Sequence, residues 1–132
     1  MTAVVVDTDV ASAIIEGRLP DHLDRALSGH RLAITFVTVG ELTQWTRLRR
    51  WGDARRAGRD AFFRSMVIVN ATVDAAIVWG GIQAAGRLRG RPRPVNDSWV
   101  AACCIARDLP LMTLNTKDYL DFAEHEGLEL LR

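Results

Sequence analysis

Residues 3–10 have the sequence AVVVDTDV, and this stretch decides the fold class. The run from Ala3 to Val6 is short, apolar and mostly β-branched, which is typical of a strand buried on both faces of a parallel sheet. It ends at Asp7, and apolar residues at helical spacing follow, so we expect a helix from Thr8 to Gly17. A buried strand that leads directly into a helix is the opening unit of an α/β fold.

Strands and helices alternate along the rest of the sequence. Further strands are expected at residues 31–35, 67–69, 111–114 and 128–131. Helices are expected at residues 20–28, 38–50, 53–66, from 72 or 74 to 88, 97–108 and 119–126. Residues 89–94, with the sequence RGRPRP, cannot continue a helix and are expected to form a basic loop. The alternation predicts one α/β domain over residues 1–132 with a mainly parallel sheet.

Composition points to an ordinary globular protein, with 48% apolar and 25% charged residues. Cys103 and Cys104 are adjacent, form no CxxC motif and lie in an apolar stretch, so we expect two core residues and a reducing cytoplasm. No signal segment begins the chain, and no apolar run approaches the roughly 20 residues that a membrane helix needs. We therefore expect a soluble cytoplasmic protein with no membrane association.

The net charge of +1 is unevenly distributed. Residues 1–41 carry −3, residues 42–95 carry +8 with eleven arginines, and residues 96–132 carry −4. Solvated helix faces can produce such a pattern. It also suits a protein that gathers cations at one place and a polyanion beside it.

Three acidic residues fall where a parallel sheet places its ligands, beyond the carboxyl ends of the strands. Asp7 ends the first strand, Glu41 lies early in the helix after the second, and Asp97 begins the helix before the fourth. Each has a purely structural explanation. Asp7 can be a polar residue at a strand end, Glu41 can be the partner of Thr38 in a capping box, and Asp97 can interact with a helix dipole.

The combination of the three acids carries more weight than any one of them. Carboxylates gathered at one site repel each other, and a divalent cation relieves the repulsion. Oxygen ligands without His or Cys alongside favour Mg²⁺ or Mn²⁺ over Zn²⁺. His22, His30 and His125 have no ligand spacing and are expected at the surface.

Four segments extend this pattern along the chain: VDTDV at 6–10, TVGEL at 38–42, NDSWVAA at 96–102 and MTLNTKDY at 112–119. In this order and spacing they resemble the PIN-domain toxins of VapBC toxin–antitoxin modules, over essentially the whole chain. The resemblance implies a PIN-like three-layer α/β/α fold and an endoribonuclease dependent on Mg²⁺ or Mn²⁺. It also implies a homodimer that a cognate antitoxin protein holds inactive.

Position by position, the resemblance implies that Asp7 and Asp97 hold the metal most directly and that Glu41 is the third acid. The family commonly has another Asp after the fourth strand, and either Asn115 or Asp118 matches it here. We therefore treat Asp118 as a catalytic candidate and Asn115 as a supporting one.

Hydroxyl groups beside these acids are expected to orient the carboxylates. The candidates are Thr8, Thr38 and Ser98. Asp9 departs from the Asn that the family more often shows there, and its charge either tightens metal binding or caps the first helix.

The expected reaction is in-line attack of a metal-activated water on a phosphodiester, which leaves a 5′-phosphate and a 3′-hydroxyl. Glu41 would hold a second ion or order the water. Basic side chains should contact the phosphates of the RNA. The candidates are Arg47, Arg49, Arg50, Arg87, Arg89, Arg91 and Arg93.

Two alternatives remain. Residues 7–10, DTDV, also fit the nucleophile motif of haloacid-dehalogenase-type phosphatases, but the only lysine is Lys117 and no Asp-Asp pair exists. The chain could also be a non-catalytic PIN-like module that binds RNA or a partner. Trp45, Trp51, Phe62 and Phe63 are expected mainly in the core, and any excess would form an antitoxin groove or a dimer face.

Overall fold

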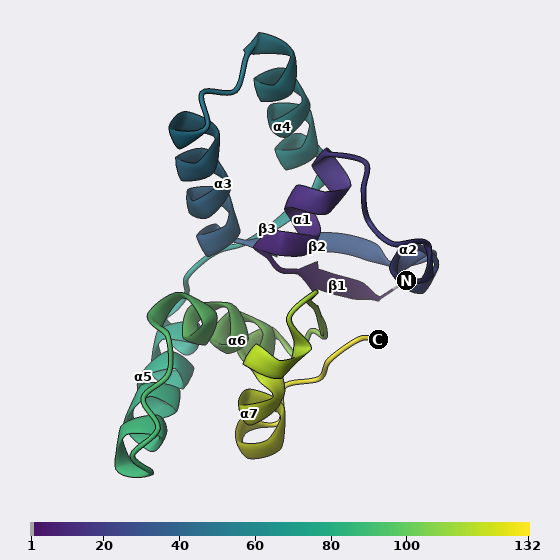
Figure 1. Cartoon of the computed structure of the whole chain (residues 1–132). Coiled ribbons are helices and arrows are strands. Elements are labelled where there is room, and N and C mark those ends of the chain that lie inside the picture. Colours follow the sequence, from purple (N-terminus) through teal and green to yellow (C-terminus); the bar gives the residue numbers. More distant parts are fainter. Residues whose placement is uncertain (1) are drawn as a thin grey trace.

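A parallel four-stranded sheet forms the centre of the protein, for which the computed structural model describes residues 2–132 (Figure 1). The strands are β1 (Ala3–Val6), β2 (Arg31–Thr35), β3 (Val67–Val69) and β4 (Leu111–Met112). Their order is β3-β2-β1-β4, and each neighbouring pair is parallel. The chain therefore builds outward from β1 on one side and returns to its other side with β4. This reversal creates a switch point at the carboxyl ends of β1 and β4, where α/β sheets bind ligands.

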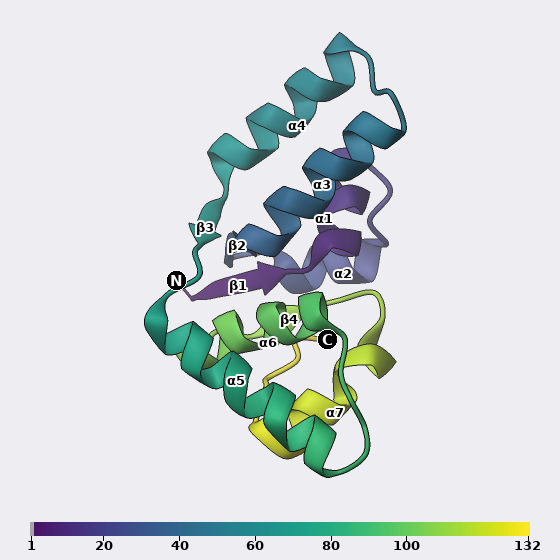
Figure 2. The ribbon, with the colours of Figure 1, turned by 90° about the vertical axis from the view of Figure 1, so that its left-hand side faces the viewer.

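Helices cover both faces of the sheet, so the fold has three layers (Figures 1 and 2). The helices are α1 (Thr8–Ile15), α2 (Asp21–Leu27), α3 (Phe36–Leu48), α4 (Asp53–Ser65), α5 (Val73–Leu88), α6 (Val95–Arg107) and α7 (Thr116–Glu126). The first four lie on one face, and α5, α6 and α7 lie on the other. The predicted three-layer α/β/α fold is confirmed.

Alternate side chains of β1 pack against the helices on opposite faces of the sheet. Val4 and Val6 pack in a cluster with side chains of α1 to α4, whereas Val5 packs with side chains of α5 to α7. Successive side chains of a strand point to opposite faces, so a strand covered on both sides is apolar throughout. This explains the unbroken apolar run before Asp7.

The start of α3 differs from the prediction. The helix begins at Phe36, directly after β2, and its N-cap Thr35 makes no side-chain capping bond. Thr38 is therefore inside the helix and fully buried, and Glu41 lies in its second turn. The predicted capping box of Thr38 and Glu41 is wrong, because both side chains turn toward Thr8 on α1.

Other boundaries also differ: β4 ends at Met112 instead of residue 114, and α7 begins at Thr116 instead of residue 119. Helix α6 begins at Val95 with Pro94 as its N-cap, two residues before the predicted start at residue 97. Proline suits the start of a helix because its φ is already helical. Residues 128–131 do not form the predicted strand and contribute only a parallel bridge between Leu130 and Leu111. The strands predicted at 31–35 and 67–69 are confirmed.

Cys103 and Cys104 are free and buried in α6, as expected for small core residues. Between residues 2 and 132, no helix has the length and apolar character needed to cross a membrane.

Candidate active site

Asp7 lies at the switch point of the sheet and is 6% exposed. It caps α1, since its Oδ1 accepts a 3.2 Å hydrogen bond from the backbone N–H of Val10. Its Oδ2 accepts a 2.6 Å bond from the hydroxyl of Thr113, just beyond β4. The first turn of α1 thus holds one carboxylate oxygen, and the residue that follows β4 holds the other.

Burial makes the charged form of Asp7 costly. It raises the pKa of the carboxyl group from 3.8 to about 6, although the hydrogen bonds from Thr113 and Val10 act in the opposite direction. The negative charge of Asp9 raises the pKa further. A cation at this position would offset this cost.

Glu41 is oriented by a chain of buried hydroxyls. Thr8 Oγ1 donates a 2.6 Å hydrogen bond to Glu41 Oε1. Because that bond uses the single hydroxyl proton of Thr8, the 2.9 Å contact between Thr8 and Thr38 has Thr38 as donor. The side-chain amide of Asn96 donates to the other oxygen of Glu41 at 3.5 Å. Thr8 thus bonds Glu41 directly, and Thr38 bonds Thr8.

Asp97 enters the same region from the first turn of α6. The Tyr119 hydroxyl donates a 3.3 Å hydrogen bond to its Oδ1. Burial raises the pKa of Asp97, and the nearby charges of Asp118, Glu41 and Asp9 add to the effect.

The three acids line one cavity of about 90 Å³, together with Thr8, Asp9, Trp45, Val100 and Tyr119. Side chains of α1, α3, α6 and α7 line this cavity, and Figure 2 shows α1 and α3 above β1 and α6 below it. None of the lining residues is basic, so no side chain of the lining neutralises the carboxylates.

The donor set fits a hydrated Mg²⁺ or Mn²⁺ ion better than a fully enclosed one. Within residues 2–132, no three His, Cys, Asp or Glu side chains stand close enough to form a preformed metal cage. Mg²⁺ usually binds through one or two carboxylates and keeps several waters, so it does not need such a cage. Oxygen donors and raised carboxyl pKa values are the features that support a cation here.

Among known proteins, the model of the PIN domain family matches residues 4–125 of this chain. The chain belongs to the PIN-domain family. It is 35% identical to Ribonuclease VapC5 of Mycobacterium tuberculosis, with 98% of this chain and 95% of that protein aligned.

Solved structures of VapBC proteins are similar to this PIN-domain protein. The VapBC-5 toxin–antitoxin structure from Mycobacterium tuberculosis matches at a TM-score of 0.70 and 30% identity, covering 100% of this chain and 99% of that chain. VapBC2 from Rickettsia felis, solved with a DNA fragment, matches at a TM-score of 0.81 and 17% identity, covering 98% and 97%. At 17% identity, the similarity to VapBC2 shows a shared fold only.

Other predicted site residues of the PIN-domain chain lie outside the acidic cavity. Asp118 is exposed in the first turn of α7 and does not line the cavity. The Asn115 amide donates to Asp9. The Ser98 hydroxyl donates to the carbonyl of Pro94 and accepts from Gln83, so it joins α6 to α5 and does not orient an acid.

Thr113 and Tyr119 contact the acids, and the sequence interpretation did not single them out. Thr113 directly follows β4 and bonds Asp7. A polar residue at the carboxyl end of a strand beside the switch point was the sequence signal that could have identified it. Tyr119 gave no signal in the sequence beyond its place at the start of a predicted helix. It is 3% exposed, and only its hydroxyl reaches Asp97.

The predicted phosphate contacts fall into separate places. Arg47 and Arg50 line a second cavity between α3 and α4. Arg49 lies over the ring of Trp45, with its Cζ 5.3 Å from the ring centroid. Arg87, Arg89 and Arg91 are exposed at the far end of α5 and in the loop that follows it.

The prediction that Arg93 contacts a phosphate of the RNA is wrong. Its side chain is 4% exposed, its Nη1 lies 2.6 Å from Glu126, and its Nη2 lies 2.7 Å from Asp121. The guanidinium also covers the ring of Phe122 at 4.7 Å. A side chain enclosed by two carboxylates of α7 is not available to a phosphate, so Arg93 stabilises the fold.

Proposed function

We propose that this protein is a divalent-metal-dependent endoribonuclease and the toxin of a toxin–antitoxin pair. The observation that carries the proposal is the meeting of Asp7, Glu41 and Asp97 in one cavity without a basic residue in its lining. Membership of the PIN-domain family and 35% identity to a protein named Ribonuclease VapC5 support it. PIN-domain VapC nucleases generally depend on a divalent metal.

Asp7 and Asp97 would hold the metal, assigned here as Mg²⁺ or Mn²⁺, and Glu41 would complete the site. When bound, such an ion supplies positive charge for the scissile phosphate and lowers the pKa of a coordinated water. Thr113 and Tyr119 keep two of the acids in place, and Thr8 keeps the third. Fixed carboxylates need little rearrangement when the metal and the RNA bind.

The proposed reaction is hydrolysis of a phosphodiester. The oxygen of water forms a bond to phosphorus, the bond from phosphorus to the 3′-oxygen breaks, and the 3′-oxygen takes a proton. The products carry a 5′-phosphate and a 3′-hydroxyl. Because no 2′-hydroxyl takes part, preference for RNA would come from the shape of the substrate and its single-stranded loops.

The proposed partners are an antitoxin protein and a second copy of the chain. Toxin–antitoxin complexes are among the solved structures that share the fold. Large apolar side chains are exposed on α5, including Val73, Ile77 and Leu88, and such surfaces often serve as protein interfaces. The two free cysteines suit a reducing compartment, and we keep the cytoplasm as the predicted location.

The test is a gel assay on structured RNA with Mg²⁺, with Mn²⁺ and with EDTA. Wild-type protein should cut the RNA with either metal, EDTA should stop cleavage, and Asp7→Asn should be inactive. Ligation of adaptors that require a 5′-phosphate should capture the new ends. Metal-dependent cleavage that Asp7→Asn retains in full would contradict the assignment of the site.

The same assay separates the alternatives. RNA binding without cleavage in any metal would favour a non-catalytic module. Hydrolysis of p-nitrophenyl phosphate without nuclease activity would favour a phosphatase, but Lys117 is exposed and outside the acidic cavity.

A further inference from the structure

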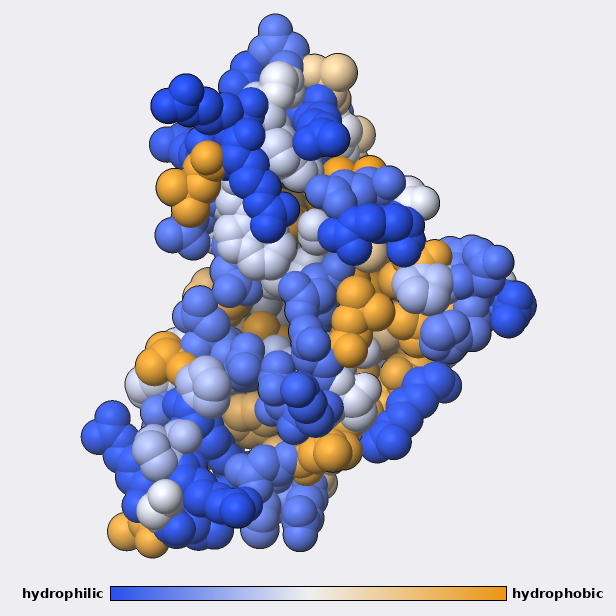
Figure 3. Space-filling model, in the orientation of Figure 1, coloured by the Kyte–Doolittle hydropathy of each residue, from blue (hydrophilic) through white to orange (hydrophobic). Residues whose placement is uncertain are grey.

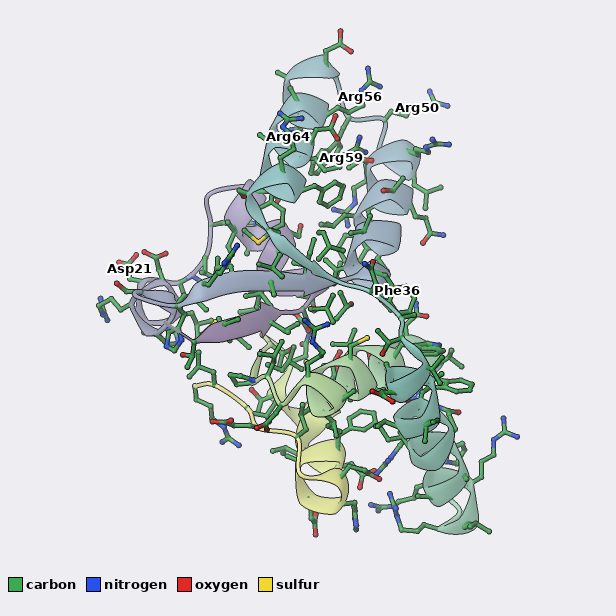
Figure 4. The ribbon with its side chains drawn as sticks, turned by 180° about the vertical axis from the view of Figure 1, so that it is seen from behind. Asp21, Phe36, Arg50, Arg56, Arg59 and Arg64 are labelled. Carbon is green, nitrogen blue, oxygen red and sulfur yellow. The ribbon has the colours of Figure 1, made fainter. Side chains whose placement is uncertain are left out.

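A second cavity, of about 500 Å³, lies between α3 and α4 and shares no lining residue with the acidic one. Four arginines line it, together with Thr43, Thr46 and Trp51. We call it the arginine pocket. Its arginines are Arg47, Arg50, Arg56 and Arg59. Figure 4 shows Arg59 between the two helices and Arg50 and Arg56 near their far ends.

The positive charge of the arginine pocket is only partly balanced. Arg56 pairs with Asp53, and Arg59 pairs with Asp60 at 3.0 Å. Between residues 2 and 132, no ion pair involves Arg47 or Arg50, so four guanidinium groups share two carboxylates. Like charges gathered in a hollow repel each other, and a bound anion relieves the repulsion.

The most buried of these arginines is held in place. The side chain of Arg59 is 15% exposed, and its Nη1 donates a 2.6 Å hydrogen bond to the hydroxyl of Thr46. The Thr46 hydroxyl in turn donates a 2.9 Å hydrogen bond to the backbone carbonyl of Thr43. A guanidinium that is already ordered loses less conformational entropy when an anion binds.

Arg50 occupies a position that normally favours glycine. It follows α3 with a φ of 52°, in the left-handed region. The turn is closed by a 3.0 Å bond from the N–H of Trp51 to the carbonyl of Thr46. A non-glycine residue in this conformation is less stable than glycine, so the arginine at this position lowers the stability of the turn.

Helix α3 connects the arginine pocket to the acidic cavity. Glu41 lines the acidic cavity, and Arg47, six positions further along the same helix, lines the arginine pocket. At 1.5 Å per residue this is roughly 9 Å along the axis, which a few nucleotides of single-stranded RNA can span. Most of the surface at the far end of the α3–α4 pair is hydrophilic, with a few apolar residues among the polar ones (Figure 3). Residues 42–65 contain seven arginines and two aspartates.

We infer that the arginine pocket binds backbone phosphates of the RNA a few nucleotides from the bond that is cut. The inference rests on the proposed nuclease function, since it names the place where the substrate is held. Guanidinium groups match phosphate oxygens through paired hydrogen bonds, and a polyanion is the ligand that can reach both cavities. Trp51, the aromatic residue of the lining, is 5% exposed, so it offers no surface on which a base could stack. The pocket therefore contacts the RNA backbone and does not recognise the base sequence.

The test compares two doubly substituted proteins in the Asp97→Asn background, in which the RNA should stay intact. One carries Arg47→Gln and Arg50→Gln. The control carries Arg25→Gln and Arg64→Gln, which remove the same charge from exposed positions outside both cavities. Binding of a fluorescein-labelled single-stranded RNA is followed by anisotropy over a range of KCl concentrations, and thermal unfolding shows that each variant is folded.

We expect the pocket variant to bind roughly tenfold more weakly than the control at low salt. The slope of log affinity against log salt should fall by about 1.4, as expected when two phosphate contacts on a single strand are lost. Arg47→Lys with Arg50→Lys should recover much of the slope and only part of the affinity, because the charge returns without the guanidinium geometry.

Equal affinities and slopes for the pocket variant and the control would overturn the inference. So would a variant that keeps RNA binding but loses binding to poly-glutamate, since the pocket would then serve an acidic protein segment. RNA cleavage by the wild-type protein is measured separately. If the wild-type protein does not cleave RNA but the pocket variant still binds RNA more weakly than the control, the proposed nuclease function is wrong and the phosphate-binding role of the arginine pocket is supported.

Discussion

The hydroxyl of Thr113 donates a 2.6 Å hydrogen bond to Oδ2 of Asp7, across 106 positions of the sequence. The bond joins the residue after β4 to the residue after β1, and these two strands are neighbours at the switch point of the sheet. Asp7 Oδ1 accepts from Val10, so each oxygen has one donor and retains a lone pair for a cation.

Replacing Thr113 by Val should weaken the site without disrupting the fold, because the two side chains have nearly the same shape. Loss of the hydrogen bond leaves Asp7 less well oriented and raises its pKa further. We expect RNA cleavage to fall about tenfold, the lower end of the effect of removing a supporting hydrogen bond. Thr2→Val, at an exposed threonine, is the matched control. Equal rates for both variants would contradict this role of Thr113.

The pH dependence of stability should reveal the buried charge of Asp7. Its pKa is about 6 in the folded protein against 3.8 as the ordinary value, so between these values the folded state binds more protons than the unfolded state. Stability of the metal-free protein should therefore fall as pH rises from about 4 to about 6.

Asp7→Asn removes that cost. Urea unfolding in EDTA should show it to be more stable than wild type at about pH 7, by up to roughly 3 kcal/mol. The difference should shrink toward about pH 4, where Asp7 is largely protonated. An Asp7→Asn protein less stable than wild type at neutral pH would argue against a costly carboxylate.

Arg93→Gln separates a structural arginine from an RNA contact. The substitution leaves Asp121 and Glu126 without their buried partner, so we expect a loss of about 3 kcal/mol in the free energy of unfolding. At a temperature where the variant is folded, its salt slope for RNA binding should match that of wild type. A lower slope with unchanged stability would return Arg93 to the phosphate contacts. Arg91→Gln, at an exposed neighbour, serves as the comparison.

Asp118 and Asp97 should differ sharply in their importance. Asp97 lines the acidic cavity, whereas Asp118 is exposed and acts on it only through its charge. We expect Asp97→Asn to lower the rate of RNA cleavage at least about 100-fold and Asp118→Asn by about threefold or less. Single-turnover cleavage under the same metal concentration measures both. Similar losses in the two variants would place Asp118 in the site.

Much of the fold could be predicted because buried strands and amphipathic helices leave clear patterns. The strands at 31–35 and 67–69 and the meeting of Asp7, Glu41 and Asp97 follow from those patterns and from the geometry of parallel sheets. The predictions that failed concerned local hydrogen bonds and helix ends. Thr38 and Glu41 have the spacing of a capping box, but tertiary hydrogen bonds to Thr8 use their side chains.

The role of an arginine could not be predicted from its charge. Arg50 and Arg93 both lie in basic stretches with glycine or proline nearby, and the sequence interpretation assigned both to the RNA. Arg93 is buried because Asp121 and Glu126, about thirty positions away, approach it from α7. Such long-range pairing leaves no local signal, whereas the arginine pocket becomes visible only when α3 and α4 pack together.

The central claim is that Asp7 and Asp97 hold a divalent cation at the acidic cavity. Isothermal titration of Mn²⁺ into the wild-type protein, Asp7→Asn, Asp97→Asn and Asp118→Asn tests it most directly. The account predicts binding by wild type and Asp118→Asn, with affinity at least about tenfold weaker in the other two. Unchanged Mn²⁺ affinity in both Asp7→Asn and Asp97→Asn would contradict it.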